Sequence, residues 1–310
     1  MSFHILHLLS PNLRVRLKLD QLRITDAETG KERSVPLADV AVIICASRNA
    51  EFSSSALRRM AELNVLLMVC DEKFQPCALT VPYYCPTNTE LLRRQVEWTP
   101  KWKEAMWRQV ITAKIRNQAA VLGHLKRARL LLNGIADLCE RGESPAYACE
   151  SRAAKNYWQR LLPRLSETET KREPRTRAGV NGMLDYGYAI VRSTVLRSLA
   201  AHGFIAALGI HHADKAGSFA LADDLMEPLR PWLDRELYQY LEKKRRDGKA
   251  SSKSVEGMEV WIPVAAALLT LEVKMDNSNV RFLNAVDLYI QSFANASLAR
   301  ESKPLKIPML

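Results

Sequence analysis

The segment PYYCPTNTE, residues 82–90, marks the point at which the pattern of this chain changes. Pro82 and Pro86 interrupt regular structure there, because proline has no backbone N–H and disfavours the helical conformation of the residue before it. Before this segment the apolar residues are spaced as in β-strands, and after it they are spaced as in helices. We therefore expect an α+β protein with a small N-terminal β-rich domain, residues 1–86, followed by a larger all-α C-terminal domain, residues 87–310.

The residues before the segment predict strands and one helix. RVRLKLDQLRIT, residues 14–25, alternates apolar and polar side chains, which is typical of a half-buried strand or hairpin. VAVIICA (40–46) and NVLLMVCD (64–71) are short apolar runs that predict buried strands. Between them SSSALRRMAEL (53–63) has helical spacing, and one of its three serines is available as the N-cap.

Helical periodicity begins near residue 89 and continues along the chain. Large apolar residues that recur at near-helical spacing are expected in the core of this region: Trp98, Trp102, Ile111, Ile115 and Val121. Further helices are predicted over 146–165, 181–208, 218–246 and 261–300. Two charged stretches, 166–178 and 243–257, are predicted to be mobile loops.

The charge of the chain favours a polyanionic partner. Its 310 residues include 45 Lys and Arg against 34 Asp and Glu, which gives a formal net charge of +11. Nucleic acid is the expected partner, because Lys and Arg displace the counterions condensed on phosphates. A membrane surface is the alternative, but no helix with a concentrated basic face supports it, and no apolar run is long enough to span a bilayer.

The N-terminus and the cysteines indicate the compartment. MSFHILHLLSPNLRVRL has no basic start before its apolar residues, so we expect no signal peptide. The six cysteines form no CxxC pair, which argues against a zinc site and for reduced thiols. We therefore expect a cytoplasmic protein.

Three carboxylates gather in FALADDLMEP, residues 219–228, although the chain as a whole is basic. On one helix Asp223, Asp224 and Glu227 would share a face and repel one another. Three explanations remain open. The positive N-terminal end of a helix dipole could stabilise the acids, although in a helix starting near Ser218 Asp223 and Asp224 would lie slightly beyond the positions where this effect is strong. They could pair with Arg230 or Arg235, or they could bind a divalent cation.

Two other segments supply side chains that suit the same cation. ALGIHHADKAG, residues 207–217, places His211 and His212 before the acidic stretch, and imidazole with carboxylates suits Mn²⁺ and accepts Mg²⁺. Glu150 lies in CESRAAKNYWQRL, residues 149–161, near the predicted start of a helix. It is either an acid of the first turn, stabilised by the helix dipole, or a third ligand.

Four segments together resemble the CRISPR-associated protein 1 family, the integrases that insert new spacers into CRISPR arrays. They are NVLLMVCDEKFQPCALT (64–80), CESRAAKNYW (149–158), NGMLDYGYAIVRSTVLRSLAAHGF (181–204) and LGIHHADKAGSFALADDLMEPLRP (208–231). The resemblance covers nearly the whole chain and includes the order of a β domain before a helical one. The form ADDLMEP is most similar to versions from type II systems.

The resemblance implies a metal-dependent DNA endonuclease and integrase. It assigns Glu150, His212 and Glu227 to a catalytic site for Mg²⁺ or Mn²⁺, with Asp224 and Asn181 as possible residues of the second shell. His211 is not expected to be a ligand. Asn181, together with Asp185 and Tyr186, opens a helix that the resemblance places beside the site, but Asn181 could equally be its N-cap. His212 could act as a proton shuttle in place of a ligand.

The resemblance also implies partners. They are double-stranded DNA (the prespacer and the CRISPR repeat), a second copy of the chain, CRISPR-associated protein 2 in a heterohexamer, and in type II systems the effector nuclease. The N-terminal domain would serve dimerisation and partner docking. The segment PLKIPML, residues 304–310, could bind a partner or be disordered.

Basic clusters are the candidate DNA contacts, and each could also be a solvated surface or loop. They comprise Arg58, Arg59, Lys171, Arg172, Arg175, Arg177, Lys243, Lys244, Arg245 and Arg246. Two other functions remain open: a structure-selective metal-dependent nuclease that does not integrate DNA, and a basic DNA-binding subunit without enzymatic activity.

Overall fold

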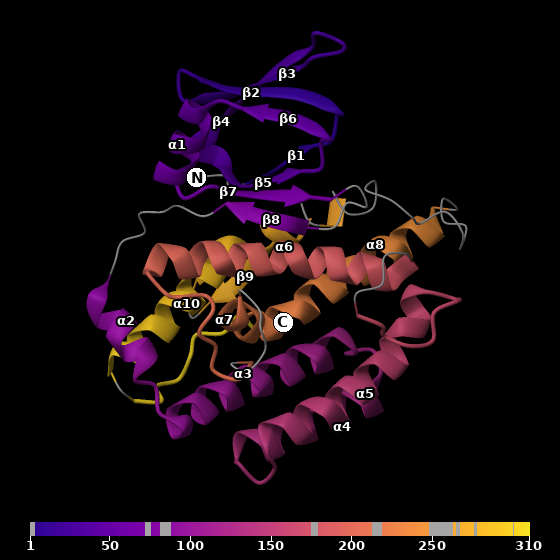
Figure 1. Cartoon of the computed structure of the whole chain (residues 1–310). Helices are drawn as coiled ribbons and strands as arrows, with labels where there is room; N and C mark the ends of the chain where they lie inside the picture. The colour runs from indigo at the N-terminus through magenta and orange to yellow at the C-terminus, as the bar shows by residue number, and fades with distance from the viewer. Residues whose placement is uncertain are drawn as a thin grey trace. The chain divides into compact units, whose positions relative to one another are not determined.

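The chain divides into two compact units, Met1–Pro86 and Thr87–Leu310. The first is rich in strands and the second is mostly helical, so the predicted α+β class is confirmed (Figure 1). The computed structural model describes residues 4–71, 76–80, 88–174, 179–212, 219–247, 263–264, 267–275, 278–299 and 301–310.

Two four-stranded sheets and one α-helix make up the described part of the first unit. One sheet has the order β1-β5-β7-β8 and the other β4-β3-β2-β6. The first sheet contains β1 (His4–Leu8), β5 (Val40–Cys45), β7 (Leu66–Cys70) and β8 (Pro76–Thr80). The second contains β2 (Asn12–Lys18), β3 (Gln21–Asp26), β4 (Glu32–Pro36) and β6 (Asn49–Phe52); the 3₁₀ turn η1 spans Leu37–Asp39 and α1 spans Ser54–Glu62.

One hydrophobic core joins both sheets to α1. The alternation read from residues 14–25 places Val15 of β2 and Leu22 of β3 in this core. The uninterrupted apolar run of β5 is buried along its whole length, as expected for a strand that pairs in parallel with β1 and β7. The predicted N-cap of α1 is Ser53, whose side chain accepts a hydrogen bond from the N–H of Ala56.

The β2–β3 hairpin has a two-residue turn at Leu19 and Asp20, and both residues have positive φ, at 51° and 56°. Such a turn matches the twist of the paired strands. Arg59 of α1 pairs with the carboxylate of Asp20 at 3.0 Å. Arg59, a predicted DNA contact, therefore holds this turn within the first unit.

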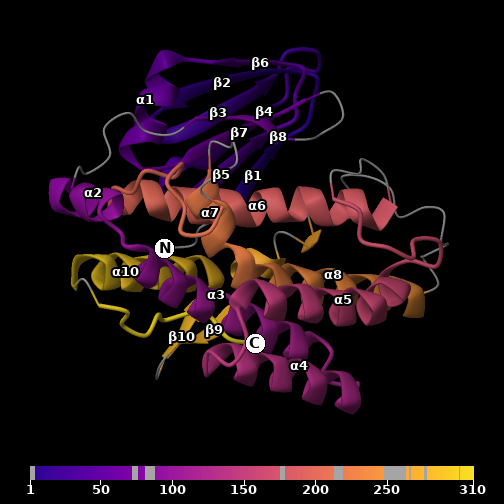
Figure 2. The same ribbon diagram turned by 60° about the horizontal axis from the view of Figure 1, so that its bottom comes forward.

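The second unit contains the remaining helices and one β-hairpin (Figure 2). Its longer helices are α3 (Pro100–Val121), α4 (Lys126–Glu140), α5 (Ala146–Leu165), α6 (Gly179–His202), α8 (Arg230–Arg246) and α10 (Phe282–Ala299). Its shorter elements are α2 (Thr89–Val96), α7 (Ala220–Leu225), the 3₁₀ turn η2 (Glu227–Leu229), β9 (Glu272–Met275) and β10 (Ser278–Arg281). Helix α3 packs against α4, α5, α8 and η2, so it lies at the centre of the elements that carry the candidate site.

Local sequence sets the start of α3. The helical pattern from residue 89 is interrupted because Thr99 caps the N–H of Trp102 and Pro100 occupies the first turn. The predicted core tryptophans lie at this junction, where Trp98 stacks on Trp102 with ring centroids 4.8 Å apart. The indole N–H of Trp98 donates to Ser297 Oγ of α10 at 2.7 Å, which fixes the junction to a distant helix.

The prediction of one helix over 261–300 is wrong. Residues 272–275 and 278–281 pair as the antiparallel strands β9 and β10, and helix α10 begins at Phe282. The sequence EVKM alternates apolar and polar residues, and a polar stretch follows it, which is the pattern of a hairpin. The second unit is therefore mostly helical, as predicted, with this short hairpin between its helices.

Two charged stretches predicted as mobile loops lie partly within the described ranges. Residues 166–174 are anchored to the start of α6, where Glu169 accepts hydrogen bonds from the N–H groups of Val180 and Asn181. Residues 243–246 are the last turn of α8. Residues 175–178 and 248–257 lie outside the described residues.

The segment 304–310 is ordered along α3. Leu305 N donates to Gln109 Oε1 at 2.8 Å, and Leu310 N donates to Asn117 Oδ1 at 2.9 Å. Pro308 is buried. The alternative that this segment is disordered is therefore wrong.

None of the helices in the described ranges combines the length and the apolarity that crossing a membrane requires.

Candidate functional site

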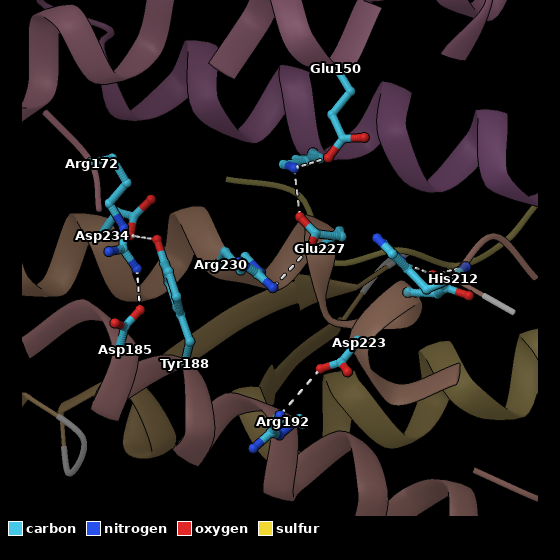
Figure 3. Close-up of polar contacts among 12 residues, drawn as sticks. Glu150, Arg172, Asp185, Tyr188, Arg192, His212, Asp223, Glu227, Arg230 and Asp234 are labelled. Carbon is cyan, nitrogen blue, oxygen red and sulfur yellow. Dashed lines mark hydrogen bonds and ion pairs between the residues drawn. The ribbon is translucent and has the colours of Figure 1, made fainter. Parts of the chain in front are cut away.

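Three elements distant in sequence bring Glu150 and Glu227 to one positively charged side chain, that of Lys114. Glu150 lies on α5, Glu227 begins η2, and Lys114 lies on α3 between them. The ammonium of Lys114 lies 2.6 Å from Oε1 of Glu150 and 2.6 Å from Oε2 of Glu227. Figure 3 shows the carboxylates of Glu150 and Glu227 directed toward each other. Two of the predicted ligands therefore converge, and they share a lysine that the sequence interpretation missed.

Glu227 is the most constrained of these groups. Its side chain is 6% exposed, and its second oxygen, Oε1, pairs with Arg230 at 3.0 Å. Burial acts to raise the pKa of Glu227, but the positive charges of Arg230 and Lys114 outweigh it, so the pKa lies below its usual value. Glu227 is therefore charged, and both of its oxygens face cations. Of the three acids in residues 219–228, only Glu227 is paired with Arg230, one of its two predicted partners, and Arg235 pairs with Glu236.

Asp224 organises the LGIHH loop. Its carboxylate is fully buried and accepts hydrogen bonds from the N–H groups of Ile210 at 2.7 Å, His211 at 2.9 Å and His212 at 3.3 Å. The loop passes so close that a Cβ on Gly209 would lie 2.6 Å from Oδ2 of Asp224. Glycine is required there because a side chain would displace this carboxylate.

His212 is oriented by the same carboxylate. Its Nδ1 lies 2.5 Å from Oδ1 of Asp224. A charged carboxylate only accepts hydrogen bonds, so we assign a proton to Nδ1, and in the neutral ring the lone pair then lies on Nε2. This arrangement is typical of histidines that bind metals through Nε2. The ring points toward Glu227, whose pKa it also lowers when charged (Figure 3).

Trp107 of α3 supports both histidines. Its ring stacks on His211 with centroids 4.3 Å apart, and it meets His212 edge to face at 5.8 Å. His211 therefore packs on an aromatic ring, while His212 is held by Asp224. That His211 is not a ligand stays a prediction.

The three acids of residues 219–228 do not share one helical face. Helix α7 ends at Leu225, and Glu227 belongs to the separate turn η2, which contains Pro228. Asp223 lies in the first turn of α7 and pairs with Arg192 at 3.5 Å. The expectation that Asp223 lies late in its helix is wrong, because α7 begins at Ala220. Each acid has a different set of partners, which removes the repulsion expected from the sequence.

Glu150 is not explained by the helix dipole. Helix α5 begins at Ala146 and has no acid in its first turn, so Glu150 lies beyond the reach of the exposed N–H groups. Its partner is the Lys114 ammonium.

Asn117 ties the segment 304–310 to the turn that carries Glu227. Its Nδ2 donates to the carbonyl of Pro228 at 2.8 Å and to the carbonyl of Pro308 at 3.0 Å, while its Oδ1 accepts from Leu310 N at 2.9 Å. Asn117 lies one turn after Lys114 on α3. Helix α3 therefore fixes the position of Glu227 in two ways. Lys114 pairs with its carboxylate, and Asn117 binds the backbone of the next residue, Pro228.

A second buried carboxylate lies behind Arg230. Asp234 is fully enclosed and accepts hydrogen bonds from the hydroxyls of Tyr157 at 2.8 Å and Tyr188 at 2.6 Å. The ring of Tyr188 lies 4.8 Å from the guanidinium carbon of Arg230 (Figure 3). Burial raises the pKa of Asp234 to about 6, although the two tyrosine hydrogen bonds oppose this shift.

Asn181 does not join the triad. Its amide bonds to Glu169, Lys171 and Arg172, which anchors residues 166–174 to α6. It is the third residue of α6, so it is not the N-cap. The predicted second-shell role of Asn181 is thus replaced by a local structural one, whereas Asp224 does contact His212.

The predicted DNA contacts differ in accessibility. Arg172 is largely buried and pairs with Asp185, and Arg245 donates to the carbonyls of Arg164 and Leu165. Arg58 is exposed beside Glu62, and Lys244 lies near the ring of Tyr240. Lys171, Lys243 and Arg246 are exposed. Arg175 and Arg177 lie outside the described residues.

The residues present fit a hard divalent cation. Two carboxylates and an oriented imidazole are donors that suit Mg²⁺ and Mn²⁺. The two glutamates already converge on the positive charge of Lys114. Within the described ranges, no three His, Cys, Asp or Glu side chains already surround a single point. Glu150 and Glu227 would hold the cation together with His212 once the lysine moved.

Comparisons with known proteins found a matching family model and similar curated proteins. A family model described as "CRISPR associated protein Cas1" matches residues 6–262. The chain is 29% identical to a CRISPR-associated endonuclease Cas1 of Neisseria meningitidis serogroup C (strain 8013), over 94% of this chain and 92% of that protein. It is 26% identical to a CRISPR-associated endonuclease Cas1 1 of Francisella tularensis subsp. novicida (strain U112), over 83% of this chain and 86% of that protein.

Solved structures share the fold. A casposase bound to an integration product has a TM-score of 0.79 at 17% identity, over 98% of this chain and 92% of the casposase. A CAS1 protein from Thermotoga maritima has a TM-score of 0.78 at 15% identity, over 96% of this chain and 98% of that one. A chain of a Cas6-RT-Cas1–Cas2 complex has a TM-score of 0.75 at 17% identity, over 99% of this chain and 36% of the other.

Replacing Asn117 with alanine should loosen both the Glu227 turn and the segment 304–310. The substitution leaves the carbonyl of Pro228 without this donor, at a cost of about 1–3 kcal/mol in the free energy of unfolding. We expect a lower melting temperature and faster hydrogen exchange at the amide of Leu310. The control is Asn284→Ala, at an exposed position of α10. Equal exchange at Leu310 in Asn117→Ala and the wild type would contradict this account.

Replacing Asp234 with asparagine should flatten the dependence of stability on pH. The pKa of Asp234 is raised by folding, so its contribution is present below the unfolded value near 3.8 and is lost as pH rises through about 6. The wild type should lose about 1–2 kcal/mol from this group between pH 5 and pH 7.5, and Asp234→Asn should not. Melting temperatures at the two pH values test this.

Asp287→Asn is the matched control, because the pKa of Asp287 is lowered, first by its hydrogen bond with His202. If Asp234→Asn kept the slope of the wild type, burial would not dominate the titration of Asp234.

Proposed function

Since the chain belongs to the Cas1 family of CRISPR-associated proteins, we propose that it is a metal-dependent DNA integrase and endonuclease of CRISPR adaptation. The proposed reaction joins the 3′-hydroxyl of a prespacer to the CRISPR repeat by transesterification. The observation that carries the proposal is the convergence of Glu150 and Glu227 on one positive charge, with an oriented His212 beside Glu227.

The proposed chemistry exchanges one phosphodiester for another. The 3′-oxygen of the incoming strand attacks phosphorus, and the 3′-oxygen of the repeat strand leaves, so no energy source is needed. A bound Mg²⁺ or Mn²⁺ screens the phosphoryl oxygens and lowers the pKa of the attacking hydroxyl. Glu150 and Glu227 would supply charged oxygens to hold this cation, and the buried partners of Glu227 keep that residue ionised.

His212 has two possible roles at this site. Its orientation by Asp224 supports a ligand that presents Nε2, in the manner of a carboxylate–histidine pair on a metal. The same ring could carry a proton from the attacking hydroxyl. In both roles Asp224 positions His212 and holds the loop before it.

The proposed partners follow from the family and from the charge of the chain. We propose that double-stranded DNA binds through exposed basic side chains, and Arg58, Lys171, Lys243 and Arg246 are exposed candidates among the described residues. We further propose that residues 1–86 serve dimerisation and docking in a heterohexamer with Cas2, in the prokaryotic cytoplasm. The similarity of the chain to part of a Cas6-RT-Cas1–Cas2 complex supports Cas2 as a partner. A type II effector nuclease is a further proposed partner.

A nuclease that does not integrate DNA would use the same residues and is the second candidate. A supercoiled plasmid carrying a CRISPR repeat, incubated with Mn²⁺ and a labelled fragment, separates the two functions. Label in the plasmid indicates integration, and a fragment whose 3′-hydroxyl is blocked should give none. Cleavage of branched DNA without label in the plasmid would favour the nuclease.

Glu150→Gln and Glu227→Gln should reduce strand transfer by about 10²-fold or more, because each removes a charged oxygen that holds the cation. Asp223→Asn is the matched control, since Asp223 lies in the same acidic stretch but pairs with Arg192. The yield of labelled plasmid measures the effect.

His212→Ala should also lose strand transfer, whereas His211→Phe keeps an aromatic ring against Trp107 and should retain it. Full strand transfer in both glutamine variants and in His212→Ala would show that these residues do not form the active site. DNA binding without strand transfer or cleavage by the wild type with Mn²⁺ would favour the non-enzymatic DNA-binding subunit.

A further inference from the structure

Lys114 occupies the position that a divalent cation needs. Its Nζ lies 2.6 Å from an oxygen of Glu150 and 2.6 Å from Oε2 of Glu227, while Oε1 of Glu227 pairs with Arg230 at 3.0 Å. Both oxygens of Glu227 therefore already face a positive charge. A metal ion that binds Glu227 on the side facing Glu150 would compete with the Lys114 ammonium for the same oxygen.

Of the two side chains, Lys114 is the one that a metal ion bound to both glutamates would displace. It bridges Glu150 and Glu227, so a cation that binds both carboxylates enters the space of its ammonium. Arg230 is held from another side, since its guanidinium lies over the ring of Tyr188. The hydroxyl of that tyrosine is in turn bonded to Asp234.

The contact between Lys114 and Glu227 is a short ion pair. Oε2 of Glu227 lies 2.6 Å from the ammonium, and its side chain is 6% exposed. Lys114 therefore neutralises the charge of Glu227 in an enclosed site. A lysine is a point charge on a flexible stem, so its head can leave while its helix stays in place.

We propose that Lys114 is a built-in competitor of the divalent cation. Its ammonium neutralises Glu150 and Glu227 in the metal-free protein and gives up this position when the metal binds. The inference rests on the proposed function, in which these glutamates hold the metal. It explains how Glu227 stays buried and charged before the metal arrives, because an unpaired charge there would destabilise the fold.

The competition should raise the observed dissociation constant of the metal. This constant equals the intrinsic one divided by the fraction of molecules in which Lys114 has left the site. If that fraction is about 1–10%, removal of the ammonium should lower the dissociation constant about 10- to 100-fold. Lys114→Met keeps a long side chain and removes the charge. Free Mn²⁺ is measured by its electron paramagnetic resonance signal during titration of the full-length protein.

Lys155→Met is the matched control, because it removes one positive charge from an exposed position of α5. We expect tighter Mn²⁺ binding in Lys114→Met only. An unchanged or larger dissociation constant in Lys114→Met would overturn the proposal.

A measurement on the wild type covers the case in which Lys114→Met does not fold. Acylation of lysines, followed by mass spectrometry, should be slow at Lys114 without metal, since its side chain is 11% exposed and ion-paired. Saturating Mg²⁺ should increase the rate at Lys114 several-fold and leave Lys155 unchanged. An equal or slower rate at Lys114 with Mg²⁺ would show that the ammonium does not leave.

Glutamine variants separate this inference from the proposed function. If Glu150→Gln and Glu227→Gln leave Mn²⁺ binding unchanged, the glutamates are not ligands and the proposed metal site is wrong. If they weaken binding while Lys114→Met does not strengthen it, the metal site stands and the role of Lys114 is wrong.

Discussion

The enclosed charge of Glu227 is the constraint on which the candidate site depends. A buried carboxylate is costly unless cations lie beside it, and Glu227 meets this need with Lys114 from α3 and Arg230 from the start of α8. Glu150 on α5 joins through the same lysine. These ion pairs fix where α3, α5 and α8 meet around η2. The Glu227 carboxylate that a catalytic cation would bind is therefore also the group around which these helices are assembled.

Asp224 provides the second fixed point. One carboxylate accepts hydrogen bonds from three successive backbone N–H groups and contacts the ring of His212, so the loop and its imidazole are positioned by a single side chain. The close approach of Gly209 shows how tightly the loop is folded around it. Asp223, its neighbour in sequence, points to Arg192 instead (Figure 3). The adjacent residues Asp223 and Asp224 thus have different partners, and the helix that carries them ends before Glu227.

Periodicity predicted the elements well where each one is long or regular. The strands around residues 14–25, the apolar β5 and β7, and the helix 146–165 follow from spacing alone. The hairpin strands 272–275 and 278–281 were missed because each has only four residues, which is too short for a period of two to be told from helical spacing. The partners of the acids depend on tertiary contacts, which spacing does not encode. Lys114 still left a signal: a charged residue between Ile111 and Ile115, on a helix whose neighbouring positions are buried.

Anomalous diffraction from crystals grown with Mn²⁺ tests the central claim most directly, because it locates the metal and the lysine together. Our account predicts one anomalous peak about 2.1 Å from oxygens of Glu150 and Glu227 and from Nε2 of His212, with the Lys114 ammonium moved out of the space between the glutamates. A peak elsewhere, or Lys114 still bridging both carboxylates beside a bound metal, would contradict it.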